Sequence, residues 1–373
     1  MATSLLSAPR ALADPASPGR RRLDLGRLGP NWYATVMGTA IVANGAAALP
    51  VAVPALTAFG RAVWLLSLGL LPILVAARLV HLARHRTAAR TQLLDQPSSA
   101  VFYGCPPMAL LAVGYGTLVV GAPVIGTGPA VAVDLVLWTV GTLYAVAVAV
   151  GIPLLMITRH RLSVLRADPT WLLPVVAPLV AASLGPALVP HLPEGAPRTA
   201  MLYGCYALFG AGLLAVFALL PVVMAALVHN KLPVLLLTPT LFLVLGPLGQ
   251  SATAVNQLAD AARLAAPGLA PSALHLAVLF GSMVLGFALL WLPVAVAANL
   301  RAWRAGMPFG MTWWAFTFPL GTLVTGASGL ARHTGFGGFT ALAGGLYVVL
   351  VAVWAVIGVR TVTGLAAGRL LSG

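Results

Sequence analysis

The sequence predicts an all-α integral membrane protein with ten transmembrane helices. Ten apolar stretches occupy nearly the whole chain between Trp32 and Val359, and a helix needs about 20 mostly apolar residues to cross a bilayer. Of the 373 residues, 60% are hydrophobic and only 8% are charged, whereas soluble domains carry about 25% charged residues. The mean hydropathy is +0.98. Because lipid offers the backbone no hydrogen-bond partner, helices are the structure expected for these stretches.

The apolar stretches set the expected boundaries. The ten spans are expected at residues 32–52, 62–80, 101–122, 131–157, 170–189, 199–227, 234–257, 273–299, 312–331 and 339–359. Residues 1–30 are expected to form a short disordered cytoplasmic tail, 31–361 the transport domain and 362–373 a cytoplasmic C-terminal tail. No cleavable signal peptide is expected, because residues 1–30 lack an apolar core of roughly 7–15 residues.

The net charge of +14 follows this topology and needs no nucleic acid to explain it. Of the 21 Lys and Arg residues, 17 fall on the side of the two termini, and only Arg61, Arg198, Arg263 and Arg332 fall on the other. Cytoplasmic loops carry an excess of Lys and Arg in membrane proteins. The distribution therefore supports ten spans with both termini in the cytoplasm, and the plasma membrane is the expected location.

The even-numbered spans share a proline at matched depth. Pro72, Pro153, Pro221 and Pro293 each lie six to eight residues before the first polar residue on the basic side, and the tenth span lacks this proline. Self-similarity of this kind predicts a helical hairpin repeated five times. Proline is also common in transmembrane helices generally, which is the simpler explanation.

The odd-numbered spans are instead rich in Pro, Gly and hydroxyl residues, as in Gly246-Pro247 and Thr317-Phe318-Pro319. Broken helices persist at membrane depth only where they are buried in protein or face water. We therefore expect the odd spans to form an inner, kinked ring and the even spans, with more Leu and Val, to face lipid. Small residues also permit tight helix packing, which explains part of the pattern.

Three segments carry a family resemblance. They are Gly29-Pro30-Asn31-Trp32-Tyr33 leading into Met37-Gly38-Thr39, Gly246-Pro247 with Gly249-Gln250-Ser251, and Trp313-Trp314-Ala315-Phe316-Thr317-Phe318-Pro319. With them the chain resembles the tellurite-resistance/dicarboxylate transporter family, over essentially all ten spans. That family includes bacterial tellurite-resistance proteins, fungal malate carriers and sulfite efflux pumps, and plant slow anion channels. Where the family often has Gly in the first motif, this chain has Ala40.

The resemblance implies an architecture and a gate. It implies five helical hairpins around a pseudo-fivefold pore lined by the kinked inner helices, a phenylalanine of the ninth helix that plugs the pore, and a homotrimer. The matching plug is Phe318, directly before Pro319, and Phe316 is its rival. Two positions on a helix differ by about 200° of rotation, so both rings cannot face the pore.

No span carries Lys or Arg near its centre, so anion preference must come from weaker sources. Half-helix N-termini carry partial positive charge, and hydroxyl groups donate hydrogen bonds. The candidate pore-lining residues are Thr39, Asn44, Pro107, Thr240, Gly246, Pro247, Gln250, Ser251, Pro319 and Thr325. Asn44, Gln250, Ser251 and Asn256 could contact the substrate or could instead bond neighbouring helices. The sequence leaves both roles open.

Four ionisable residues need an assignment. Asp134 in the fourth span and His275 at the start of the eighth are candidates for proton coupling, although each also fits an interfacial or packing role. His81 and His85 are expected to be solvated surface residues rather than a metal site, because no further ligands lie nearby in the sequence. No metal and no cofactor are expected.

The leading hypothesis is transport of small anions through a pore gated by a phenylalanine. The substrates considered are sulfite, chloride or nitrate, and a C4-dicarboxylate such as malate. The alternative is a proton-coupled secondary carrier for sulfite or a dicarboxylate, which the scarcity of titratable residues in the spans disfavours modestly. A membrane enzyme or cofactor protein is a remote alternative, because haem needs axial ligands on facing helices and the histidines cluster at helix ends. Neither enzymatic activity nor a nucleic-acid partner is expected.

Overall fold

The computed structural model describes residues 25–51 and 53–371, and within these ranges every regular element is a helix. Eight helical segments of the described chain are long and apolar enough to cross a membrane. They are Pro54–Arg84, Pro97–Ile125, Thr127–Thr158, Pro169–His191, Ala196–Asn230, Leu235–Ala265, Pro267–Arg304 and Gly337–Ala366. Helices α1 (Tyr33–Ala48) and α12 (Thr317–Thr334) occupy the places of the first and ninth expected spans, but they are not among the eight. The count of ten spans therefore stays a prediction.

Two classes of segment alternate along the chain. In the segments Pro97–Ile125, Pro169–His191 and Leu235–Ala265, 61%, 94% and 83% of the apolar window is buried. Most of α1 and α12 is buried as well. The exposed class keeps only 22–33% of its window buried; it comprises α2 (Pro54–Arg84), α7 (Thr127–Thr158), α9 (Ala196–Asn230), α11 (Ala270–Arg304) and α13 (Gly337–Ala366). The odd segments are thus internal and the even helices external, as the distribution of Pro, Gly and Leu predicts.

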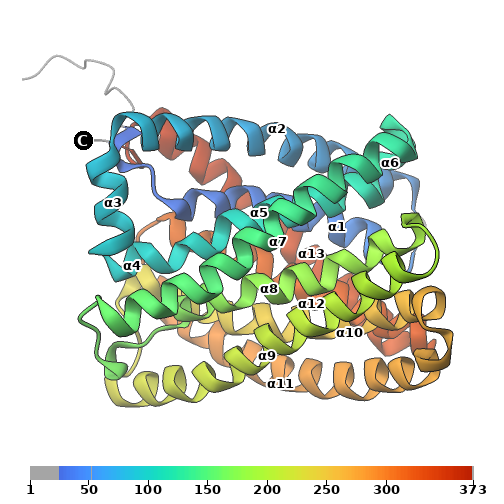
Figure 1. Ribbon diagram of the computed structural model, residues 1–373. Helices are drawn as coiled ribbons and strands as arrows, with labels where there is room; N and C mark the ends of the chain where they lie inside the picture. The colour runs from blue at the N-terminus through green and yellow to red at the C-terminus, as the bar shows by residue number, and fades with distance from the viewer. Residues whose placement is uncertain (1–24, 52, 372–373) are drawn as a thin grey trace, which may run out of the picture.

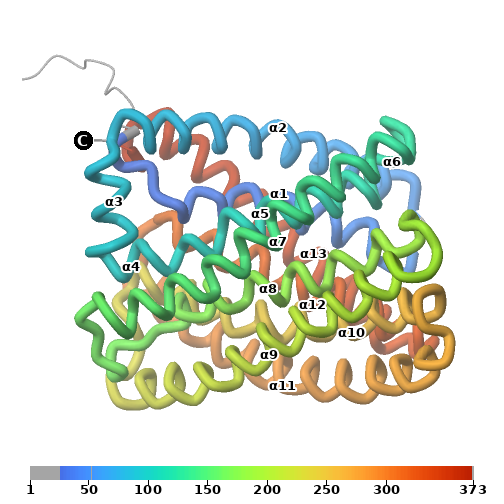
Figure 2. The backbone as a smooth tube through the Cα atoms, viewed as in Figure 1, coloured from blue at the N-terminus to red at the C-terminus, as the bar shows by residue number. Residues whose placement is uncertain are grey.

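The five buried segments close into a ring. Helix α1 packs against α5 (Cys105–Gly116), α5 against α8 (Leu172–Leu184), α8 against α10 (Leu245–Ala265), α10 against α12, and α12 back against α1. Each also packs against the exposed helix that follows it in the chain. In Figure 1, α2, α9 and α11 lie at the outside of the bundle and the long helices run side by side. Figure 2 shows the chain passing back and forth between the two ends.

In each buried segment a 3₁₀ stretch directly precedes the main α-helix. These stretches are η2 (Pro30–Trp32), η3 (Val101–Gly104), η6 (Pro169–Trp171), η8 (Leu235–Val244) and η10 (Met311–Phe316). The segment of α5 is further modified: α4 (Pro97–Ala100) precedes it, and a π-helical turn, η4 (Thr117–Gly121), and α6 (Ala122–Ile125) follow it. The remaining elements are η1 (Leu25–Arg27), α3 (Arg86–Leu94), η5 (Val164–Arg166), η7 (Gly185–His191) and η9 (Pro267–Leu269). The recurrent 3₁₀-to-α change agrees with a five-times repeated hairpin.

The two ends of the bundle differ in charge. We call the end at which the buried segments begin the basic face; Arg84, Arg159, Lys231, Arg304 and Arg369 lie at or after the ends of the exposed helices there. The opposite end, the far face, carries Arg61, Arg198, Arg263 and Arg332. Helix α3 marks the basic face on the left of Figure 1.

The expected tails are only partly described. Residues 1–24 of the predicted N-terminal tail lie outside the described residues. At the other end, α13 continues to Ala366, and Leu371 packs against Leu28 and Trp32. These contacts join the two ends of the described chain at the basic face.

Candidate anion pathway

A small cavity of about 40 Å³ lies inside the ring, in its basic-face half. All five buried segments line it, and one residue from each is Met37, Met108, Val176, Gly246 and Phe318. The lining is mostly apolar; Thr240 and Thr312 supply hydroxyl groups. Since this cavity brings all five buried segments to one space, it is the candidate pathway.

The first turns of the five inner α-helices meet at this cavity. Ala34, Cys105, Leu172, Gly246 and Phe318 each lie at the first or second position of their helix, and each lines the cavity. The N-terminal end of a helix carries the positive end of its dipole, equivalent to roughly half an elementary charge. The lining holds no Lys or Arg, so any positive potential in the cavity must come from the backbone of these segments.

The two candidate gate residues point to different spaces. Phe318 is 4% exposed and lines the central cavity. Phe316 packs edge-on against Phe242 with ring centroids 4.8 Å apart, and it lines a separate groove between α11 and α13. The helical rotation between the two positions separates them as expected. Whether Phe318 gates conduction stays a prediction.

The three resemblance motifs meet at helix contacts. A methyl group at Gly38 of α1 would lie 2.8 Å from the Trp314 ring and would also overlap the Thr317 hydroxyl. A methyl group at Gly249 of α10 would lie 2.6 Å from the backbone nitrogen of Leu323 in α12. Only glycine fits at these two positions because α12 approaches both neighbours closely. Part of the motif pattern is thus explained by the packing of α1, α10 and α12.

The other predicted pore residues divide into two groups. Thr240, Gly246, Pro247 and Pro319 line the cavity, and the Thr240 hydroxyl donates to the Leu237 carbonyl at 2.6 Å.

The second group consists of residues buried between helices or bonded to other groups: Thr39, Asn44, Pro107, Gln250, Ser251 and Thr325. Asn44 donates to the Ala112 carbonyl at 3.0 Å, and Gln250 donates to the Ser183 hydroxyl. Asn256 donates to the Ala252 carbonyl of its own helix at 2.7 Å. Hydrogen bonding within and between helices is thus observed for this group, and substrate contact remains a prediction.

The two candidates for proton coupling lie away from the cavity. Asp134 of α7 is 1% exposed and faces Gly114 of α5, where a methyl group would lie 2.7 Å from its Oδ1 atom. Its Oδ2 atom has no hydrogen-bond partner among the described residues. His275 is exposed on α11. Asp134 is therefore a buried carboxyl group behind the inner ring, and His275 is a surface residue.

The expectation for His81 is wrong. Its side chain is buried rather than solvated, because α2 continues to Arg84 and α3 packs against it. The His81 and His85 rings lie 5.8 Å apart. No group of three or more potential metal ligands occurs among the described residues.

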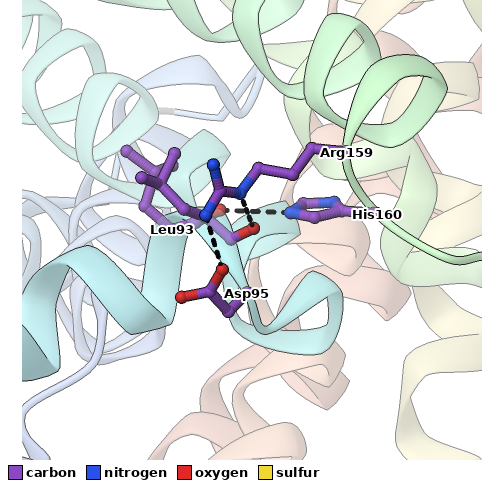
Figure 3. Close-up of polar contacts among 5 residues, drawn as sticks. Leu93, Asp95, Arg159 and His160 are labelled. Carbon is purple, nitrogen blue, oxygen red and sulfur yellow. Dashed lines mark hydrogen bonds and ion pairs between the residues drawn. The ribbon is translucent and has the colours of Figure 1, made fainter.

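Side chains at the basic face tie the helix ends together. Arg159, which follows α7, donates to the Leu94 carbonyl at 3.0 Å and pairs with Asp95 at 2.9 Å (Figure 3). Beside it, His160 Nε2 lies 3.2 Å from the Leu93 carbonyl oxygen. Asp168 caps η6 by accepting from the Thr170 backbone at 2.8 Å; burial raises the pKa of this carboxyl, although the bonds from Thr170 oppose the shift. Within the described residues, Asp95 and Asp168 are the acidic side chains at this face, against the five basic residues named above.

Sequence reasoning missed several residues of this region. Met37, Cys105, Met108 and Val176 line the cavity, yet their apolar side chains carry no chemical signal in the sequence. Met37, Met108 and Val176 lie three or four residues after the start of their α-helices, and Cys105 is the first residue of α5. This spacing is the one pattern that could have found them. Arg78, near the basic-side end of the second expected span, was given no role, but it is 7% exposed and donates to the Leu28 carbonyl and, at 2.8 Å, to the Tyr103 hydroxyl.

Comparison with known proteins identifies relatives over most of the chain. Residues 27–362 match the family described as voltage-dependent anion channel. A sulfite efflux pump of Arthroderma otae is 27% identical over 353 residues, which cover 92% of this chain and 93% of the pump. A sulfite efflux pump of Trichophyton rubrum is 26% identical over 340 residues, 89% of each chain. An uncharacterized transporter of Methanocaldococcus jannaschii is 25% identical over 346 residues, 92% of this chain and 95% of that one.

Proposed function

Because this chain belongs to the voltage-dependent anion channel family, whose members transport anions and are not enzymes, we propose that it carries small anions through the cavity inside its inner ring. The observation that supports this path is that all five buried segments line one cavity, with Phe318 in its lining. In the proposed mechanism the Phe318 ring obstructs the apolar cavity, by steric block and by excluding water. The finer architecture proposed is ten spans in pseudo-fivefold order, cytoplasmic termini, a plasma-membrane location and a homotrimer.

The charges around the cavity favour the entry of anions but not their tight binding. The five helix N-termini attract negative charge, while the basic face raises the anion concentration at the mouth. Since the lining holds no Lys or Arg, an anion is not trapped by a fixed opposite charge. This combination of entry without tight binding is what conduction requires.

Sulfite is the first substrate to test, because two relatives are named as sulfite efflux pumps. Chloride, nitrate and malate form the comparison set. The chain is only 26–27% identical to these pumps, so sulfite is proposed as the substrate. The flux assay decides among the four anions.

One observation favours a second candidate function, the proton-coupled carrier. Asp134 is a buried carboxyl group with an oxygen that has no partner among the described residues, and buried ionisable groups in membrane spans often mark proton relays. Its place behind α5, away from the cavity lining, favours the passive path instead.

The test is anion flux into proteoliposomes, comparing wild type, Phe318→Ala and the matched control Phe316→Ala. Removing an obstructing ring is expected to raise flux by about tenfold in the Phe318→Ala variant. The Phe316→Ala variant should match wild type, because that ring lines the outer groove. The pathway proposal fails if Phe316→Ala raises flux and Phe318→Ala does not. Flux that follows an imposed pH gradient and disappears in Asp134→Asn would instead establish the carrier.

A further inference from the structure

A hydrogen bond crosses the interior of the ring beyond the cavity. Gln257 of α10 donates through Nε2 to the Tyr115 hydroxyl of α5 at 3.1 Å. Helix α8 stands between α5 and α10 in the ring and packs against both. The outer flanks of α8 are covered by α7 and α9. A bond between these two non-neighbouring helices therefore passes through the space that the ring encloses.

Helical periodicity places both residues on the cavity-lining face. On α5, steps of three or four residues lead from Met108 through Ala112 to Tyr115. On α10, the same steps lead from Pro247 through Gln250 and Ala254 to Gln257. Seven residues separate Met108 from Tyr115, a rise of about 10 Å. The Tyr115–Gln257 bond thus lies about 10 Å from the level of Met108 toward the far face.

The exposed fractions of the two side chains support placing them on the interior face of the ring. Tyr115 and Gln257 are partly exposed, although the residues directly before and after each of them are buried. Thr325, one step farther along the face of α12 that carries Phe318 and Thr322, shows the same contrast. These three residues belong to different inner helices, and we infer that the surface each keeps accessible faces the far half of the ring interior.

We propose that the Tyr115–Gln257 bond is a second closure of the anion path, in series with Phe318. The two closures differ in kind. Phe318 obstructs an apolar space, whereas Tyr115 and Gln257 close theirs with a neutral hydrogen bond between groups that can each donate to an anion. An anion that accepts a hydrogen bond from each group replaces the bond that it breaks, which lowers the cost of opening. This inference rests on the proposed function of the ring interior.

The flux test relies on the two closures being barriers in series, so that the higher barrier limits the flux. With Phe318 present, Tyr115→Ala alone should raise flux only slightly, because the Phe318 barrier in series still limits it. In the Phe318→Ala background, adding Tyr115→Ala should raise flux by about tenfold again. The matched control is Phe318→Ala with Tyr203→Ala, because Tyr203 is exposed on α9. If Phe318→Ala conducts and the Tyr115 double variant conducts no better, the second closure is refuted while the proposed function stands.

A labelling test is independent of flux. Ala254→Cys puts a thiol at a fully buried position of α10, one turn before Gln257, where a reagent from the far face can reach it only if the space beyond it opens. The background carries Cys105→Ser and Cys205→Ala. A membrane-impermeant thiol reagent added at the far face should react about tenfold faster when Tyr115→Ala is also present. Equal rates with and without Tyr115→Ala overturn the proposal, even if no variant conducts. Tyr115→Phe, which keeps the ring and removes the bond, replaces Tyr115→Ala if the alanine variant does not elute as a folded protein.

Discussion

The two halves of the inner ring are built from the same five helices but hold together in different ways. In the basic-face half, apolar side chains such as Met37, Met108 and Val176 surround a cavity. In the far half, hydrogen bonds join the helices: Gln250 with Ser183, Thr253 with Thr325, and Gln257 with Tyr115. An apolar space closes by excluding water, and a hydrogen-bonded one closes by pairing its donors and acceptors. One pathway can therefore combine two barriers that respond to different properties of the anion.

The largest expected effect is on stability, and it tests how tightly the inner helices are packed at two nearby glycines of α10. Gly249→Ala adds a methyl group 2.6 Å from the backbone nitrogen of Leu323, whereas the nearest atom to the same methyl group at Gly246 is Pro319 Cγ at 3.8 Å. We expect Gly249→Ala to lower the free energy of unfolding by about 3 kcal/mol or more. Gly246→Ala should be tolerated, since alanine also favours the helix by about 1 kcal/mol. Thermal unfolding in detergent measures both, and equal midpoints would contradict the difference in packing.

The second prediction alters the wetting of the apolar half. Val176→Thr replaces a cavity methyl group by a hydroxyl of similar size, and it should raise anion flux several-fold, on the order of 1 kcal/mol of barrier, if exclusion of water limits conduction. The matched control is Val175→Thr, because Val175 is equally buried but does not line the cavity. Flux that rises equally in both variants would show that loosened packing, not wetting, is the cause.

The third prediction compares one hydroxyl group from each half. The Thr325 hydroxyl bonds Thr253 of another helix at 2.7 Å, while the Thr240 hydroxyl bonds only the nearby Leu237 carbonyl. Side-chain bonds between transmembrane helices are worth about 0.6 kcal/mol on average. Thr325→Val should therefore lower the unfolding free energy by about that amount, and Thr240→Val should change it less. A larger loss from Thr240→Val would reverse the contrast.

The smallest effect is expected outside the ring, at the basic face. Arg159 and Asp95 are 49% and 51% exposed, and exposed ion pairs contribute about 0–1 kcal/mol. Arg159→Gln should shift the unfolding midpoint only slightly, with less effect at high salt, and should leave flux unchanged. A marked loss of flux would mean that the contact between α3 and α7 controls the pathway.

Local composition was sufficient for much of the fold. The apolar stretches predict the membrane class, and the concentration of Pro, Gly and hydroxyl residues in alternate stretches predicts which segments are buried. Phe318, Pro319, Gly246 and Pro247 line the cavity, and their place in a conducting pore stays a prediction. These features can be predicted because the surroundings of a helix, whether lipid or protein, determine which residues suit it. The composition of each segment therefore indicates its place in the bundle.

Other features depended on contacts between segments distant in the sequence. Only the tertiary structure directs the Asn44 side chain to the Ala112 carbonyl, buries His81 beneath the turn to α3, and brings Tyr115 to Gln257 across 142 positions of sequence. A polar residue in an inner helix can face the interior or a neighbour, and the choice depends on the rotation of the helix within the ring. The sequence by itself therefore determined which helices are inside, and the tertiary structure decided which of their side chains meet, because composition is a local property and helix rotation is a property of the assembled ring.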